Sequence, residues 1–373
     1  MINGNMKRMA GSKRVGGNTR WLPAMVCVLV SGPLVSATPE TGINLETLMS
    51  DDIILTDCLA YLLHSKGDYE TVLSYKHADF RIDYRPAEAA LIGEANDRHE
   101  SKDSLRLASQ GPLGDDLLWL AEGGGYLGFD DFQSVWIDEY YRQTFKDYAG
   151  YEAGDPKGVD GLLGLRWDYL QTSGFAKFSV FAGHDRISPQ WDPVFGQGLV
   201  PSRSSFDSVG GRIELENVLT RRFRTHNQLT MSDISERAPR WSFETMDNFA
   251  LTDSWVLKGT MGCAFENPDF HAFWTTAVAE WDYQKKWFVG LNARFYQDSG
   301  ETDDLILYGV DAPPATTFGA SATLRWIDGP NQASCGIGPY WSRYDDQDKT
   351  SPVAELFTDR SWLWIQLAWS RQF

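Results

Sequence analysis

Charged side chains alternate along two neighbouring stretches of the chain, RIELE at 212–216 and RFRTH at 222–226. Read at every second position, these stretches give Arg212, Glu214, Glu216, Arg222, Arg224 and His226. A period of two places such residues on one face of a β-strand. Two chemistries are open to this face: a ladder of salt bridges between the strands, or a region that selects anionic or zwitterionic solutes.

A second group has the residue types that nucleophilic catalysis needs. His184 ends a strand-like run, and Ser202, Ser204 and Ser205 stand at the start of the next one. A hydroxyl nucleophile requires a base within hydrogen-bond reach. The chain has no G-x-S-x-G motif. A lipid hydrolase is therefore kept as an alternative, and no catalytic residue is assigned.

Metal chemistry finds less support. The six histidines have no paired spacing. Acidic loops suit hard cations such as Ca²⁺, but solvated loops have the same composition. No metal site and no cofactor is predicted.

The elements that must position these residues are strands. From residue 71 onward the hydrophobic period is two, which predicts fourteen strands of mostly ten to thirteen residues at 73–85, 117–128, 135–145, 161–171, 175–184, 206–218, 221–232, 240–249, 255–267, 271–283, 286–297, 316–328, 331–342 and 361–373. A tilted membrane-spanning strand needs about 9–11 residues, whereas strands of soluble proteins cluster near about 5–6. The lengths favour a membrane barrel over a soluble β-sandwich.

The connections sort by side. Counted back from the C-terminus, long connections such as 343–360, 298–315, 185–205 and 86–116 alternate with short turns such as 328–331 and 283–286. Short turns at one end and long loops at the other are typical of outer-membrane barrels.

Alternation also assigns the two faces of the predicted barrel. One set is apolar and is expected to face lipid, as in Trp287, Val289 and Leu291. The other set is charged and is expected to line the lumen. Its candidate selectivity residues are Arg166, Arg212, Glu214, Glu216, Arg222, Arg224, His226, Glu244, Arg294 and Arg325. Asp168, Lys177, Lys258, Glu280 and Asp282 complete the set. These charges either flank a water-filled channel or pair across a narrow barrel and close it.

Loop 185–205 precedes this charged region and is a candidate constriction loop. Its Arg186, Trp191 and Arg203 combine cations with an aromatic ring. Residues of these types could bind a sugar or an organic anion as it passes through the mouth of a channel.

The N-terminal part divides in two. Residues 1–37 have the features of a signal peptide: five basic residues without an acid, an apolar core, and Val35-Ser36-Ala37 as a cleavage site. Residues 38–70 are expected to form a periplasmic helical segment, because leucines from Leu45 to Leu63 have helical spacing. Residues 71–373 are the predicted barrel.

Composition excludes some classes. The formal net charge is −17, and a leader that is removed takes only basic residues with it, so nucleic acid is not an expected partner. Beyond residue 40 no segment has the roughly 18 uncharged apolar residues of a spanning helix.

The last strand carries a family resemblance. SWLWIQLAWSRQF at 361–373 alternates apolar residues, with Trp369 near its end and Phe373 as the last residue. Together with the signal and the asymmetric loops, this resembles Gram-negative outer-membrane β-barrel proteins in general. The resemblance implies that the barrel-assembly machinery reads Trp369 and Phe373. Arg371 departs from the apolar residue usual in that group, and an arginine can extend to the interface.

The sequence therefore predicts an all-β, antiparallel up-and-down barrel of about 14 strands, within a range of about 12–16, in the outer membrane and in contact with lipid and lipopolysaccharide. The expected function is a porin-like channel for passive diffusion of small hydrophilic solutes. The alternatives are the lipid hydrolase and a closed structural or export-partner barrel that docks through the helical segment.

Overall fold

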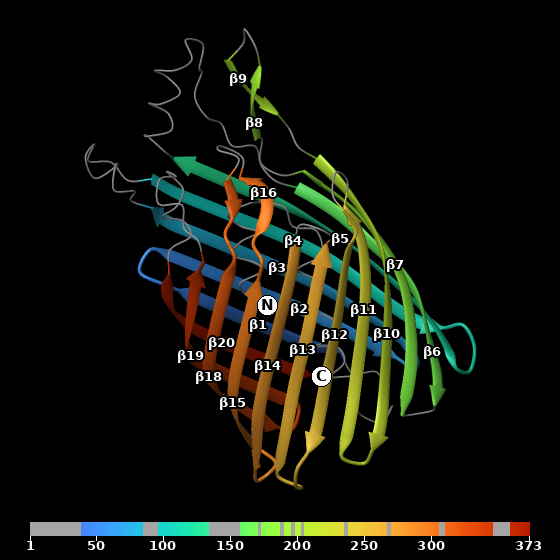
Figure 1. Cartoon of the computed structure of the whole chain (residues 1–373). Coiled ribbons are helices and arrows are strands. Elements are labelled where there is room, and N and C mark those ends of the chain that lie inside the picture. The colour runs from blue at the N-terminus through green and yellow to red at the C-terminus, as the bar shows by residue number, and fades with distance from the viewer. Residues whose placement is uncertain are drawn as a thin grey trace.

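The computed structural model describes residues 39–84, 96–133, 157–170, 173–186, 190–194, 198–202, 205–234, 238–266, 270–305, 310–345 and 359–373. Their strands form one closed antiparallel barrel of sixteen strands and two small two-stranded sheets (Figure 1). Among the described residues, no helix has the length and apolar character needed to cross a membrane.

The barrel strands follow the chain in order, each paired with its sequence neighbour in the barrel. They are β1 (Glu40–Met49), β2 (Ile53–Lys66), β3 (Tyr69–Tyr84), β4 (Asn96–Pro112), β5 (Leu117–Gln133), β6 (Lys157–Leu170), β7 (Gly174–Arg186), β10 (Ser205–Thr220), β11 (Phe223–Ile234), β12 (Arg240–Ala250), β13 (Trp255–Glu266), β14 (Phe270–Tyr283), β15 (Trp287–Asp298), β18 (Ala315–Asp328), β19 (Asn331–Tyr344) and β20 (Arg360–Gln372). The two small sheets are β8 (Gln190–Val194) with β9 (Gly198–Ser202), and β16 (Glu301–Leu305) with β17 (Val310–Ala312).

The first and last strands close the barrel. β1 pairs with β20 in antiparallel register, from Glu40 opposite Gln372 to Met49 opposite Leu363. At the end of this seam the amide of Phe373 donates a hydrogen bond of 2.8 Å to the carbonyl of Pro39. The aromatic final strand therefore has partners on both sides, and closure leaves the barrel without a bare edge.

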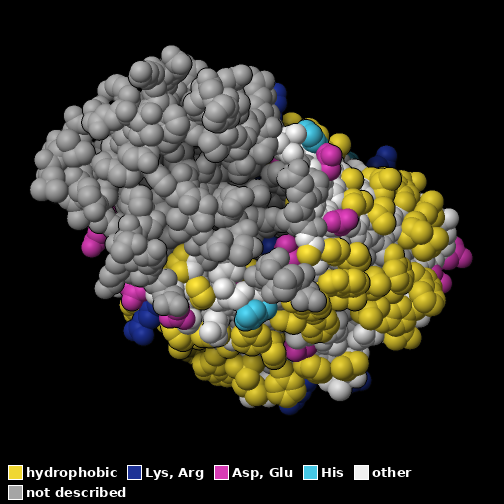
Figure 2. Space-filling view, turned by 45° about the horizontal axis from the view of Figure 1, so that its top comes forward, with side chains coloured by type: hydrophobic (Ala, Val, Ile, Leu, Met, Phe, Trp, Pro, Cys, Tyr) yellow, Lys and Arg dark blue, Asp and Glu magenta, His cyan; other side chains and the backbone are white. Residues whose placement is uncertain are grey.

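The two faces of the wall differ as their alternation predicts. In β15, Trp287, Val289 and Leu291 are exposed, whereas Gly290 between them is buried. The register carries these outward positions onto apolar residues of β14 and β18. Figure 2 shows hydrophobic side chains covering much of the described wall. Lipid is the solvent that suits such a surface.

The two ends of the barrel differ as well. Turns such as 67–68, 113–116, 221–222 and 329–330 lie at one end. The connections that hold β8–β9 and β16–β17 lie at the other end, together with turn 50–52 (Figure 1). We call these the short-turn end and the long-connection end.

The predicted helical segment is wrong: residues 40–49 and 53–66 are β1 and β2. The cause is a strand that is apolar on both faces. Leu55 packs inside with Leu48 and Phe80, while Ile54 and Leu62 lie exposed on the outer face. A strand of this kind loses its period of two, and its leucines then match helical spacing.

The barrel has sixteen strands, which is the upper limit of the predicted range and two more than the fourteen segments located in the sequence. β1, β2 and β4 were missed, and β4 fell in the segment interpreted as loop 86–116. Its sequence NDRHESKDSLRLASQGP is too polar to show a hydrophobic period. The predicted strand 135–145 lies outside the described residues, and the other thirteen predicted strands all correspond to strands of the barrel.

The interior carries two apolar clusters toward the long-connection end. One contains Leu48, Ile53, Leu55, Phe80, Tyr340, Trp362 and Trp364, and the other contains Ala264, Phe270, Ala272, Trp274 and Tyr296. Charged residues line much of the rest of the inner wall, on β4 to β12.

Candidate functional site: a charged inner wall

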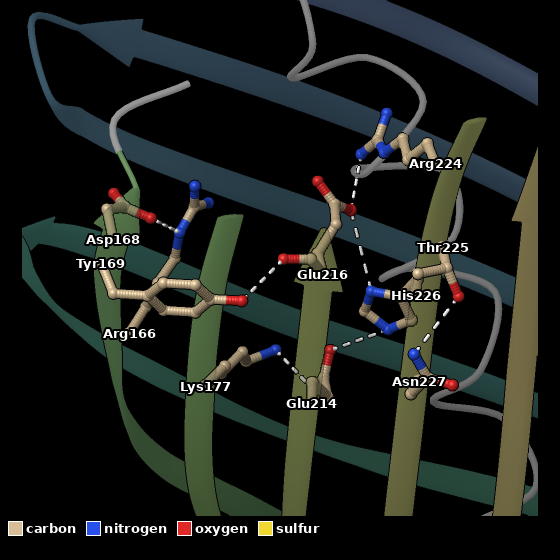
Figure 3. Close-up of polar contacts among 10 residues, drawn as sticks. All are labelled: Arg166, Asp168, Tyr169, Lys177, Glu214, Glu216, Arg224, Thr225, His226 and Asn227. Carbon is tan, nitrogen blue, oxygen red and sulfur yellow. Dashed lines mark hydrogen bonds and ion pairs between the residues drawn. The ribbon is translucent and has the colours of Figure 1, made fainter. Parts of the chain in front are cut away.

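The predicted charged residues of β10 and β11 face the interior together. Glu216 lies directly opposite His226, and Glu214 lies opposite Gln228 on β11 and opposite Lys177 on β7. Because side chains on paired positions point to the same face, these strands bring their charges into one layer (Figure 3). We call Arg166, Lys177, Arg212, Glu214, Glu216, Arg224 and His226 the charged wall.

Glu214 is the centre of this wall. Its side chain is about 2% exposed, and its Oε1 lies 2.9 Å from Lys177 Nζ. The second oxygen, Oε2, lies 3.6 Å from His226 Nε2, and Arg212 Nη1 lies 4.0 Å from Oε1. Three basic groups therefore surround one buried carboxylate.

Glu216 forms the next rung. Its Oε2 accepts a hydrogen bond of 2.6 Å from Arg224 Nη2 and lies 3.7 Å from His226 Nδ1. His226 thus stands between two carboxylates, one at each ring nitrogen (Figure 3).

Arg166 extends the wall onto β6. Its guanidinium lies 4.2 Å from the ring centre of Phe175, and its Nε donates a hydrogen bond of 2.7 Å to Asp168. Phe175 in turn lies 6.2 Å from the His226 ring, between ring centres. The arginine is thus held flat along the wall by an aromatic face and a carboxylate.

Other interior charges also pair along the wall. Glu280 Oε1 lies 3.1 Å from Lys258 Nζ and 3.0 Å from Arg325 Nη2. Glu244 accepts a hydrogen bond of 2.7 Å from Trp274 Nε1. Each of these contacts joins strands that are adjacent or separated by a single strand. The side chains therefore line the inner circumference, and the contacts run around it.

Two predicted lumen residues have other surroundings. Arg294 faces the ring of Trp364 at 5.5 Å. The prediction for Arg222 is wrong: this residue lies in the short turn before β11, is exposed, and donates a hydrogen bond of 3.5 Å to the carbonyl of Leu251. β11 begins at Phe223, so Arg222 stands in the turn and not in the inward row of the strand.

The predicted constriction loop contains regular structure. Arg186 is the last residue of β7, and Trp191 lies in β8, opposite Pro201 of β9. Figure 1 draws this hairpin beyond the rim of the barrel. Arg203 lies outside the described residues. The role of this segment as a constriction stays a prediction.

The predicted assembly residues lie at the closing seam. Trp369 faces Ile43 of β1 on the outer wall, and Phe373 stacks under Arg371, whose guanidinium lies 5.1 Å from the ring centre. Recognition of these residues by an assembly machinery stays a prediction.

Sequence analysis missed some interior charges, among them the buried pair of Arg240 and Glu266 and a cluster around Arg106. Arg106 on β4 forms ion pairs with Glu122 of β5 and, at 2.6 Å, with Asp160 of β6. The sequence does contain an alternating pattern that could have indicated this strand. Every second position forms a mostly polar row that faces inward, but the positions between them are not strongly apolar. The inward row is Lys102, Ser104, Arg106, Ala108 and Gln110.

Comparisons with known proteins support the fold. No protein-family model matches the chain, and no curated protein matches it. CdiB from Acinetobacter baumannii superposes with a TM-score of 0.55 at 9% sequence identity, over 90% of this chain and 60% of that one. The likeness to CdiB concerns the fold alone.

Looser similarity extends to solved channels. The Pseudomonas putida toluene transporter TodX aligns over 97% of this chain and 95% of its own, with 11% identity and a TM-score of 0.48. A monoaromatic hydrocarbon channel, CymD, aligns over 91% and 89%, with 9% identity and a TM-score of 0.48. The chain has the fold of outer-membrane β-barrels, and these two likenesses carry no further weight.

Proposed function

We propose that this protein is an outer-membrane channel for passive diffusion of small hydrophilic solutes, and that the charged wall sets its ion preference. The observation that carries this proposal is a closed barrel of sixteen strands whose interior charges pair along the wall. Barrels of about 16–18 strands have a circumference that leaves an aqueous channel.

The outer surface supports the same proposal. A wall of exposed leucine, valine and aromatic side chains suits the hydrocarbon of a bilayer. In this proposal residues 1–37 direct export, the last strand is read by the assembly machinery, and lipopolysaccharide meets the long-connection end. The export-partner alternative loses its basis, because the segment on which it relied forms β1 and β2.

The test is single-channel conductance of the refolded protein in a planar bilayer. Steady conductance with an ion preference is the expected result. Arg166→Gln and Arg224→Gln should lower the ratio of chloride to potassium permeability, because both arginines are partly exposed within the barrel.

Arg222→Gln is the matched control, since this arginine lies in the turn and should leave the ratio unchanged. A correctly folded barrel that carries no current would contradict the channel proposal. Equal effects of all three substitutions would remove the charged wall as the source of selectivity.

A further inference from the structure

We propose that Ser205, His184 and Asp207 form an ester-hydrolysing site on the outer wall of the barrel at the long-connection end. The substrate would be an acyl ester of a membrane lipid. This activity is separate from conduction through the interior.

The three residues share one face of the β7–β10 pair. His184 lies directly opposite Asp207, and its Nδ1 lies 2.7 Å from Asp207 Oδ1. Ser205 precedes Asp207 by two residues, so it lies on the same face and diagonally beside His184. Diagonal neighbours of this kind are within reach of long side chains. The carboxylate holds the ring proton on Nδ1 and leaves Nε2 free as a base.

A cavity adjoins this group. Its volume is about 470 Å³, and its lining includes His184, Ser205, Lys157, Leu127 and Val159. The lining therefore joins a nucleophile and a base to apolar walls and one cation. An acyl chain fits against Leu127 and Val159, while Lys157 is placed for the negative charge of an oxyanion or a phosphate.

The position of the site matches the boundary of the membrane. Two residues further along β7, away from the long-connection end, Ala182 lies opposite Val209. Beyond them, Val180 and Leu163 continue an exposed apolar surface. At the level of His184 the outer face also carries polar side chains, those of Asp207 and Lys157, beside the apolar Leu127 and Val159. The ester groups of lipids lie at such a boundary, between hydrocarbon and headgroups.

The His184–Asp207 pair contributes little to the stability of the barrel. Both side chains are more than half exposed, at 56% and 79%. An ion pair on such a surface adds about 0–1 kcal/mol to stability. An oriented imidazole beside a hydroxyl and a cavity is the arrangement that acyl transfer requires.

The chemistry balances without any cofactor. Ser205 Oγ attacks the ester carbonyl carbon, and its proton passes to His184 Nε2. The carbon–oxygen bond to the alcohol breaks, and the leaving oxygen takes the proton from His184. Water then attacks the acyl-serine and gives a proton to His184, which returns it to Ser205 as the fatty acid leaves.

The test measures fatty-acid release by the full refolded protein in vesicles of phosphatidylglycerol and phosphatidylethanolamine. Ser205→Ala and His184→Ala should each lower the rate by about 100-fold or more. A fluorophosphonate probe should label the wild-type protein on Ser205, found by mass spectrometry, and should not label the Ser205→Ala variant.

The chain supplies a matched control. On β3 and β4, His77 Nδ1 lies 2.9 Å from Asp103 Oδ1, and Ser101 precedes Asp103 by two residues. The residues that line the cavity do not include these three. His77→Ala and Ser101→Ala should keep the wild-type rate.

Channel conductance of every variant shows that the barrel has folded and inserted. No release above protein-free vesicles by a conducting wild-type protein overturns the proposal. So does a Ser205→Ala variant that hydrolyses at the wild-type rate, or equal losses from the His77 and His184 substitutions.

Discussion

At the scale of single residues, Glu214 is the position on which the charged wall depends. Lys177, His226 and Arg212 all face its carboxylate, which is almost fully buried. Glu214→Gln would remove the negative charge that these basic groups face. Removing one partner of a buried ion pair typically costs about 3–5 kcal/mol. We expect that loss in the free energy of unfolding, measured by guanidinium denaturation of the barrel in vesicles.

A second substitution provides the comparison. Glu216→Gln should cost less, because its partner Arg224 is 29% exposed and can turn to water. The double variant Lys177→Met with Glu214→Leu should recover part of the stability, since an apolar pair can replace a buried ion pair. Equal losses for the two single variants would contradict this account.

The spacing of RIELE and RFRTH predicted which charges share a face, and the ladder follows from it. The spacing could not place Lys177 against Glu214, because that contact depends on the register between β7 and β10. It also placed Arg222 inside, because the alternation of charges does not show at which residue β11 begins.

At the scale of elements, the β14–β15 hairpin carries backbone strain. Gln284 and Lys285 have φ values of 59° and 56°, a region that favours glycine or asparagine. Asp282 Oδ1 supports the turn by accepting a hydrogen bond of 2.7 Å from the amide of Lys285. Gln284→Asn with Lys285→Gly should therefore raise the free energy of unfolding by about 1–2 kcal/mol. The measurement is the guanidinium midpoint.

A single change at another turn gives the control. In the turn of Gly67 and Asp68 the φ > 0 position is already glycine, so Asp68→Asn should shift the midpoint little. A lower midpoint for the β14–β15 variant would show that the native side chains contribute more than the strain costs.

Strands with one apolar and one polar face could be predicted from the sequence, and those with two similar faces could not. The sequence of β15 has a clear hydrophobic period of two. β2 is apolar on both faces, and β4 is polar on most of its inner and outer positions. In both cases the neighbouring strands decide the structure, through interior packing in β2 and ion pairs in β4.

At the scale of the whole molecule, an ion pair at the long-connection end adds to the ladder that closes the barrel. Arg360 donates two hydrogen bonds to Asp52, from Nε at 3.0 Å and from Nη2 at 2.8 Å, and so ties β20 to the turn between β1 and β2. Partial burial favours the protonated acid, but the hydrogen bonds and charge of Arg360 outweigh it and hold the pKa of Asp52 below 3.8.

This sign fixes a pH dependence. A lowered folded-state pKa stabilises the seam above the ordinary pKa, and the stabilisation disappears as the pH falls through the folded value. The protection factors of the amides along β20 against hydrogen exchange should therefore fall between about pH 5 and about pH 2. Asp52→Asn should have lower protection factors at pH 5 and show a smaller fall. Identical profiles for the two proteins would contradict a role for this pair.

The seam also determines how the barrel must assemble. Glu40 and Gln372 touch across a sequence separation of 332 residues. This is a contact of very high order, and such contacts slow folding because the chain must lose much conformational entropy before they form. The two residues flanking the seam, Pro39 and Phe373, are already in hydrogen-bond contact. A circular permutant that links them and opens the chain at Gln284 would turn this closing step into the formation of a hairpin.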